Sequence, residues 1–419
     1  MLISYWIGPE TVNPGVWITT FLVVIVGSNY WNARYLSEYE FCLSHFRIMI
    51  MLGLMVLSFV LALGIGPNHD QGGFRYWRAP GAFNVNTTDK VLGYFYAICR
   101  TMPAATFAYL GSELIGMAIV QTQSPRRTSR AIRLTFRRIF VFNVVSVILL
   151  GMIIPYDSEL LAFARKARIS AAASAFVVAI ELASIRVLPS ILNGCILLFV
   201  LSASNYGLCM ATKALYLLAV EKQAPRFLSR LDRRGVPIYS LGMCSLLSTS
   251  AYMNIFKESR VLFGHLVQLV SMFGLLAWIT ILITHIAFVQ ARKAQKIPDK
   301  ALAFRAPFGA FGSVVTLVCC IFIGSMRWFD LFHRSSEGEK GFDYKTFVTS
   351  YIGVPLYLIL ILGYKLITKS GGIEFVQVDL WAERAEFERS GRNAMVLIVE
   401  DNQSRRGGWK DRLIKAWML

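Results

Sequence analysis

Residues 92–121 read LGYFYAICRTMPAATFAYLGSELIGMAIVQ. This mostly apolar run of thirty residues is long enough to cross a bilayer. Pro103 lacks a backbone N–H, Gly111 lowers the helix propensity, and Glu113 places a carboxylate where hydrocarbon is expected. Because an acid inside a membrane span is costly, the pattern predicts a broken membrane helix with a functional carboxylate.

The composition is that of an all-α integral membrane protein. Of 419 residues, 55% are hydrophobic and 16% are charged, against about 25% charged in soluble proteins. The net charge of +18 resides in short connections between apolar runs, which argues against a nucleic-acid partner. The seven cysteines are odd in number and form no CxxC pair, so we expect buried free thiols rather than disulfides or zinc ligands. No nucleotide-binding loop, metal-ligand spacing or nucleophile–base pair is visible, so we expect no enzyme activity, cofactor or metal.

Nine apolar segments approach the length of a bilayer crossing, about 17–25 residues. They are residues 15–30, 46–66, 92–121, 139–155, 188–212, 237–255, 261–290, 308–326 and 347–368. A shorter amphipathic stretch, 170–186, is predicted to be a re-entrant or surface helix. Residues 1–368 thus form a predicted transmembrane domain, and 369–419 a polar tail whose end, 409–417, either lies on the inner leaflet or is disordered.

The charges of the connections predict the orientation. Four alternate connections, 31–45, 122–138, 213–236 and 291–307, hold 18 Lys and Arg in 73 residues, and the opposite set holds 13 in 96. By the positive-inside rule the first set and the C-terminal tail are cytoplasmic. The first residues then face outward, which suggests that a segment precedes them.

Eight short motifs follow one another along the chain. They are YEF (39–41), GFRYWRAPGAF (73–83), FAYLGSELIG (107–116), SPRR (124–127) with AIRLTF (131–136), SASN (202–205), LYLLA (215–219), RGVP (234–237), and Ala277-Trp278 with His285. Taken together and in this order, they resemble the motifs of the fungal amino-acid permeases of the amino acid–polyamine–organocation superfamily. The resemblance extends to about residue 390.

This resemblance implies a LeuT-like fold, an inverted repeat of five plus five helices with substrate held between broken spans one and six. The nine segments would be family spans 4–12, so the expected fold is incomplete and lacks spans one to three. The stretch 92–121 would be span six, with residues 106–111 as its unwound loop.

Substrate-contacting residues are expected around this loop. By resemblance, the loop binds the α-amino and α-carboxylate groups of an amino acid, and Phe107 closes over its side chain. The candidate substrate residues are Phe107, Ala108, Tyr109, Gly111, Ser112, Glu113, Asn205 and Ser271. Asn205 and Ser271 could instead serve ordinary helix packing, because small polar residues often do so in membranes.

Two residues are candidates for proton coupling. Glu113 is either a proton-linked carboxylate or a structural hydrogen-bond acceptor; pairing with Arg100 is disfavoured because thirteen residues of helix separate them by about 20 Å. Arg47 resembles a span-five lysine that stands in for a sodium ion in proton-coupled relatives. Arginine effectively cannot lose its proton, so coupling at that position is in doubt, and a snorkelling interfacial role is the alternative.

The expected function is proton-coupled amino-acid uptake by alternating access in a multi-pass protein of the plasma membrane, with the amino acid, protons and the lipid bilayer as partners. Two alternatives follow from the expected absence of span one. The chain could be a truncated permease-like protein that does not transport, or a membrane sensor of amino acids.

Overall fold

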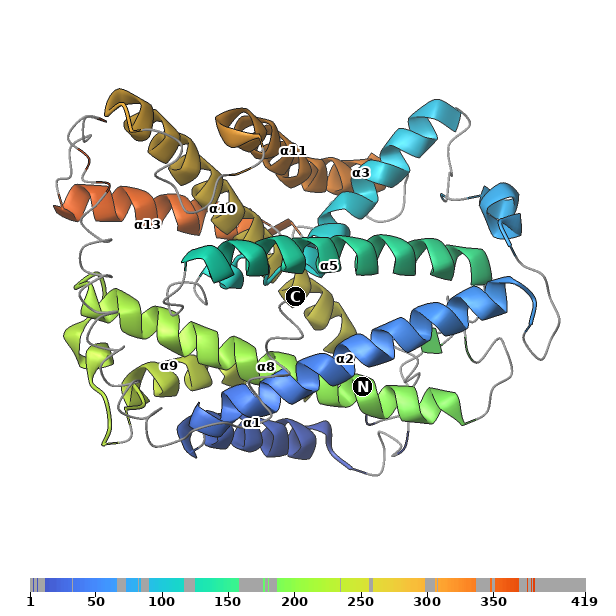
Figure 1. Cartoon of the computed structure of the whole chain (residues 1–419), viewed down its shortest axis with the longest axis horizontal. Coiled ribbons are helices and arrows are strands. Elements are labelled where there is room, and N and C mark those ends of the chain that lie inside the picture. Colours follow the sequence, from blue (N-terminus) through green and yellow to red (C-terminus); the bar gives the residue numbers. More distant parts are fainter. Residues whose placement is uncertain are drawn as a thin grey trace. The chain divides into compact units, whose positions relative to one another are not determined.

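The computed structural model is all-helical throughout the residues that it describes (Figure 1). These are residues 3, 6, 12–31, 33–65, 73–81, 83, 90–116, 125–157, 176–177, 180, 187–233, 235–255, 259–297, 306, 308–336, 347–348, 351–368, 375, 378 and 380. At some helical positions, Arg100 and Pro103 among them, only the backbone is described. The predicted C-terminal segment 409–417 and most of 170–186 lie outside the described residues.

The helices follow the apolar segments of the sequence. They are α1 (Pro14–Trp31), α2 (Ala33–Ala62), the π-helical turn η2 (Trp77–Gly81), α3 (Lys90–Tyr109), α5 (Pro125–Ile153), α8 (Leu188–Val220), the 3-10 turn η3 (Arg226–Ser229), α9 (Ile238–Ser248), the 3-10 turn η4 (Thr249–Ile255), α10 (Ser259–Ala294), α11 (Gly309–Ser336) and α13 (Gly353–Thr368).

Five segments of these helices are long and apolar enough to cross a membrane, in the part of the chain that is described. They are Tyr39–Ala62, Arg130–Ile153, Leu188–Val220, Gly264–Ala294 and Gly309–Met326, with Gly353–Ile367 as a shorter apolar helix. The helices α1, α3 and α9 are not in this set. The last two end early, α3 at a break after Tyr109 and α9 where the chain tightens into η4. The number of nine spans therefore stays a prediction.

The chain divides into two compact units. The first unit comprises residues 1–98 and 138–264, and the second comprises 99–137 and 265–419. In the first unit, α8 packs against α1, α2, α9 and η3. One of its cores is formed by Leu208, Val236 and Leu241 against α1 side chains. The hydroxyls of Thr19 on α1 and Tyr252 on η4 lie 2.8 Å apart.

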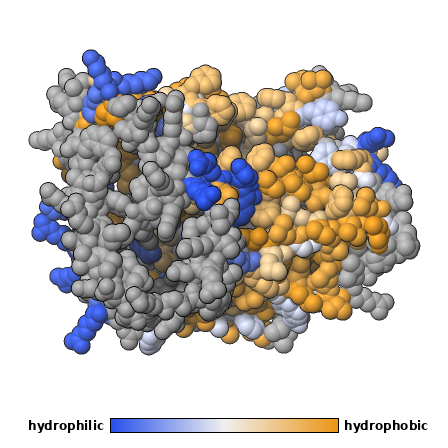
Figure 2. All heavy atoms as spheres, viewed as in Figure 1, coloured by the Kyte–Doolittle hydropathy of each residue, from blue (hydrophilic) through white to orange (hydrophobic). Residues whose placement is uncertain are grey.

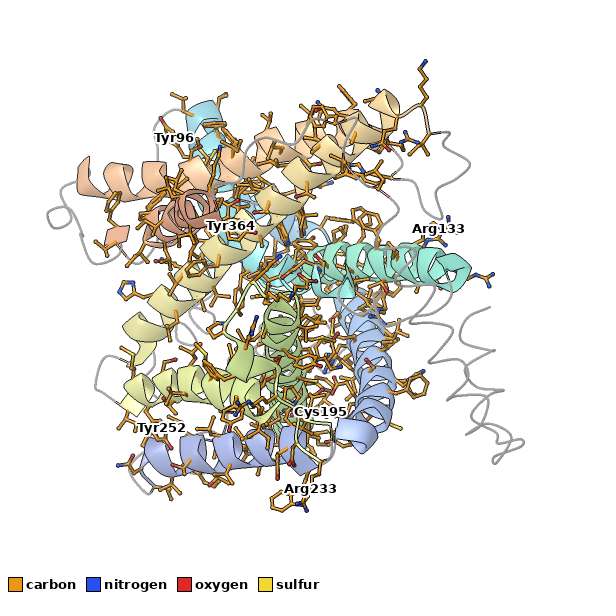
Figure 3. All side chains as sticks on the ribbon, turned by 90° about the vertical axis from the view of Figure 1, so that its left-hand side faces the viewer. Tyr96, Arg133, Cys195, Arg233, Tyr252 and Tyr364 are labelled. Atoms are coloured by element: carbon orange, nitrogen blue, oxygen red, sulfur yellow. The ribbon has the colours of Figure 1, made fainter. Side chains whose placement is uncertain are left out.

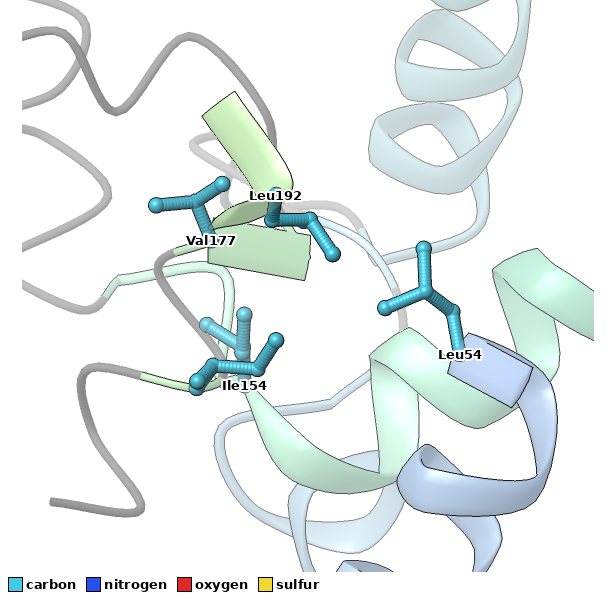
Figure 4. Close-up of a cluster of buried hydrophobic side chains, with 5 residues drawn as sticks. Leu54, Ile154, Val177 and Leu192 are labelled. Atoms are coloured by element: carbon cyan, nitrogen blue, oxygen red, sulfur yellow. The ribbon is translucent and has the colours of Figure 1, made fainter. Parts of the chain in front are cut away.

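A second core of the first unit lies where α2, α5 and α8 meet a segment of the predicted amphipathic stretch (Figure 4). Leu54, Ile154 and Leu192 pack there with Val177 and Ile180, which are 0% and 2% exposed. The described part of 170–186 is therefore buried against protein, an environment that a helix lying on the surface would not have.

In the second unit, α10 packs against α11 and α13. Met272, Leu275 and Leu276 of α10 form a buried cluster with Cys320 of α11. Side chains of α13 close this cluster, and the hydroxyl of Tyr351 donates a hydrogen bond of 3.0 Å to the carbonyl of Gly324.

Large apolar side chains cover much of the described surface (Figure 2). Met49 on α2 is 71% exposed, and Ile367 on α13 is 85% exposed. A water-soluble protein rarely exposes so much contiguous apolar surface, whereas lipid-facing helices require it. Basic side chains of the predicted cytoplasmic connections, such as Arg133 and Arg233, project away from the helices (Figure 3).

The cysteines depart in part from the expectation of buried thiols. All seven are free, and Cys99 and Cys320 are buried. Cys42 and Cys319 are exposed, because their positions lie on the outer faces of α2 and α11.

Candidate functional site

The helix of the stretch 92–121 breaks at residues 110–113. Backbone N–H groups of Leu110, Ser112 and residues 114–116 donate to carbonyls three residues earlier, as Leu110 does to Phe107 at 3.3 Å and Gly116 to Glu113 at 3.0 Å. Gly111 has a φ of +96°, a conformation that strains any residue with a Cβ. The sign of φ thus changes from negative in α3 to positive at Gly111, and a helical turn resumes at residue 114.

The break is shorter than the sequence predicted and starts later. Residues 106–109, expected in the unwound loop, belong to α3, and α3 also continues through position 103. The hydroxyl of Thr106 donates to the carbonyl of Met102, four residues earlier, at 3.0 Å. A bond of this kind forms between residues on successive turns of a helix. The positive φ of Gly111, rather than proline, therefore sets the position of the break.

Glu113 folds back over the break and is held by two donors. The backbone N–H of Gly111 donates to both carboxylate oxygens, at 3.1 and 3.0 Å. The indole Nε1 of Trp278 on α10 donates to Oε2 at 3.1 Å. The carboxylate thus satisfies a backbone group that the break exposes and ties the broken segment to α10.

Close packing adds to this link between the break and α10. Leu110 lies directly on Gly274, where any Cβ would overlap its side chain. Ser271, one turn earlier on α10, is 2% exposed, and its hydroxyl donates to the carbonyl of Val267 at 2.6 Å. Small residues at 271 and 274 therefore let the broken segment approach α10.

The other candidates in the broken segment differ in exposure. Phe107, Ala108 and Tyr109 are exposed, Phe107 by 44%, whereas Ser112 is half-buried. Thr106, which the sequence reasoning did not single out, is buried instead. Phe107 and Tyr109 therefore keep exposed aromatic surface.

Arg47 in the first unit has partners on two helices. Its Nη2 donates to the hydroxyl of Ser202 on α8 at 3.0 Å, and lies 3.8 Å from Oε1 of Glu40 on its own helix. Its guanidinium carbon lies 5.4 Å from the ring centroid of Phe199. Ser202 in turn donates to both oxygens of Glu40, at 2.6 and 2.7 Å. Sequence reasoning quoted Glu40 within a motif and missed its role, although its spacing of seven from Arg47 places both on one helix face.

Asn205 is bound to α1. Its Oδ1 accepts hydrogen bonds from Nδ2 of Asn29 at 2.6 Å and from the hydroxyl of Ser28 at 3.1 Å. Asn205 is 6% exposed and Asn29 is 7% exposed. This contact joins α1 and α8 through buried polar groups, which are strongly directional in an apolar surrounding.

The structure therefore collects the predicted residues into two groups. Residues 107–109, 111–113 and 271 belong to the second unit, and Glu113, Gly111 and the α10 segment contact one another. Arg47 and Asn205 belong to the first unit and lie in separate hydrogen-bond networks. Arg100, offered as a disfavoured partner of Glu113, has no described side chain.

Long apolar helices, a break with a hydrogen-bonded acid and lipid-facing surfaces define a multi-pass membrane protein of the transporter type. A family model described as "Amino acid permease" matches residues 1–373. The chain belongs to the amino acid permease family, whose members are transporters of the expected superfamily, and this confirms the predicted family and the all-α membrane-transporter class.

Three relatives illustrate the similarity. The dicarboxylic amino acid permease of Saccharomyces cerevisiae is 44% identical over 98% of this chain and 67% of its own length. An uncharacterized amino-acid permease of Schizosaccharomyces pombe is 35% identical over 90% of this chain and 71% of its own. The proline-specific permease of Saccharomyces cerevisiae is 32% identical over 99% of this chain and 65% of its own length. The chain spans about two-thirds of the length of these relatives.

Proposed function

We propose that this chain carries amino acids across the plasma membrane by alternating access, with protons as the coupling ion and the C-terminus in the cytoplasm. The observation that carries the proposal is the break at 110–113 with Glu113 bound across it. Irregular backbone at membrane depth is tolerated where it contacts protein or lines a cavity, and transporters bind substrate at such breaks.

The broken segment offers complementary groups to an amino acid. The C-terminal end of α3 presents the negative end of a helix dipole, which suits the substrate's α-ammonium group. Phe107 and Tyr109, exposed within their unit, supply aromatic surface for the substrate's side chain. Ser112, Ala108 and Gly111 leave room for close approach.

Acidic amino acids are the proposed substrate class. The support is the 44% identity over nearly the whole chain to a permease named for dicarboxylic amino acids. Glutamate and aspartate should then compete with each other for uptake, whereas proline and lysine should not.

The test is uptake of labelled glutamate, aspartate, proline and lysine by cells that lack their own uptake and make only this chain. Saturable glutamate and aspartate uptake, abolished by a protonophore, is the expected result. Uptake that ignores the proton gradient refutes proton coupling, and binding without flux supports a sensor. Glu113→Gln should decouple uptake from pH, while Glu221→Gln, an exposed acid after α8, should not.

A further inference from the structure

One face of α5 is exposed over about five turns of the helix. With 3.6 residues per turn, six exposed positions of α5 fall within an arc of about 80°. They are Arg130, Arg133, Arg137, Val141, Val144 and Ile148. We call this set the α5 stripe. Its first three positions are basic and its last three are apolar, so one helix face presents charge at one end and hydrocarbon along the rest.

The opposite face of α5 packs against protein. Ser146 and Leu149 are each 7% exposed, and Leu150 and Ile153 pack against the core that α5 shares with α2 and α8. These positions lie about 120–180° around the helix from the middle of the stripe. The stripe therefore points away from the core. Along a segment that crosses a membrane, such as Arg130–Ile153, a face of this kind contacts lipid.

The arginines of the stripe lie in a connection without acids. Residues 122–138 contain six Arg and no Asp or Glu, whereas residues 213–236 contain six Lys and Arg together with Glu221 and Asp232. The salt bridge found among the described residues joins Arg47 to Glu40 and does not involve the stripe. Arg133 projects away from α5 (Figure 3). The basic end of the stripe therefore offers guanidinium groups to an anion from outside the chain.

The dimensions of the stripe fit a phospholipid. The eleven residues from Arg137 to Ile148 rise by about 16 Å along the helix axis. One leaflet contributes about half of the hydrocarbon thickness of about 30 Å, so the apolar part of the stripe matches the depth of one leaflet. A guanidinium group binds phosphate oxygens in pairs and is more weakly hydrated than an ammonium group. A free phosphate ion or an acidic protein would use the arginines and leave Val141 and Val144 without a partner.

We propose that the α5 stripe binds one anionic phospholipid, with the headgroup on the three arginines and the acyl chains along the apolar half. The predicted orientation places the basic end at the inner leaflet, which contains phosphatidylserine and other anionic lipids. A zwitterionic lipid presents the same phosphate, but its ammonium group offsets the attraction. The inference does not depend on the proposed function, because lipid binding is measured without transport.

The first test is native mass spectrometry of the purified full chain in detergent, titrated with phosphatidylserine or with phosphatidylcholine. The wild type should bind its first phosphatidylserine at least tenfold more tightly, because each basic side chain near anionic lipid contributes about a fivefold factor. Arg→Gln at all three stripe arginines should abolish this preference. The matched control, Arg→Gln at the exposed Arg226, Arg230 and Arg233, removes the same charge and should keep it. Equal affinity for the two lipids in the wild type, or equal losses in both triple variants, overturns the proposal.

A second measurement locates the lipid on the wild-type chain and needs no variant. Phosphatidylserine with a photoactivatable diazirine at the end of an acyl chain should label α5 around Val144 and Ile148, and should do so more than the matching phosphatidylcholine. Labelling confined to other helices refutes the site. Inorganic phosphate and soluble polyglutamate should leave the labelling unchanged. Displacement by phosphate would show a simple anion site, and displacement by polyglutamate a surface for acidic proteins; either result overturns the proposal.

Discussion

Trp278→Phe tests whether the indole positions Glu113 at the break. The substitution keeps an aromatic ring in the α10 cluster and removes the N–H that donates to Oε2 at 3.1 Å. A hydrogen bond to a charged group contributes about 1.5–3 kcal/mol, and one between neutral groups about 0.5–1.5 kcal/mol. In a Glu113→Gln background, where the acceptor is a neutral amide, the same substitution should therefore cost about 1–1.5 kcal/mol less than it does against a carboxylate.

The assay is a double-mutant cycle on initial rates of glutamate uptake. About 1.4 kcal/mol of coupling corresponds to a tenfold difference between the rate losses in the two backgrounds. If Trp278 acts through Glu113, the loss of uptake in Trp278→Phe should appear in the maximal rate and in the pH profile of uptake more than in KM. Trp17→Phe, the same chemical change at a ring stacked on Phe21 of α1, controls for loss of indole area. Equal losses with and without Glu113 would refute the positioning role.

Three further substitutions test the packing around the candidate site. Gly111→Ala should cost about 1–2 kcal/mol because of its φ of +96°, whereas Gly116→Ala, with open space at its Cβ, should be tolerated; thermal unfolding in detergent compares them. Asn205→Ala should lower stability by about 1–3 kcal/mol, since it removes the Oδ1 that accepts from the buried Asn29 amide, and Ser204→Ala next to it should not. Gly274→Ala should lower stability by about 1–3 kcal/mol through overpacking, and it should also slow uptake. Uptake at the wild-type rate would mean that the close contact with the broken segment is dispensable.

Much of the fold could be predicted because apolar runs of bilayer length leave few alternatives to helices. The break was also predictable, since a glycine and an acid two residues apart lie in a long apolar stretch. Its extent was not, because α3 continues through Pro103 and ends only at Tyr109, before the positive φ of Gly111. Sequence patterns predict that a helix forms. Contacts with other parts of the chain decide, to within a few residues, where that helix ends.

The partners of the two acids could not be predicted. Trp278 is 165 residues from Glu113, and Ser202 is 162 residues from Glu40. A single sequence carries no information on which side chains at such separations meet. The residue types did indicate that each acid needs a donor, because an unpaired charge in an apolar surrounding is costly.

Glu113 and Glu40 each join two segments of the chain through a side-chain hydrogen bond. Glu113 joins the broken segment to α10, and Glu40 joins α2 to α8, each through a donor on a distant helix. In lipid, the association of helices depends on van der Waals packing and interhelical hydrogen bonds, since lipid tails are as apolar as leucine. A change of charge at either acid therefore alters a contact that holds two helices together. Under the proposed function, making or breaking such a contact would shift the balance between the two helix arrangements that alternating access requires.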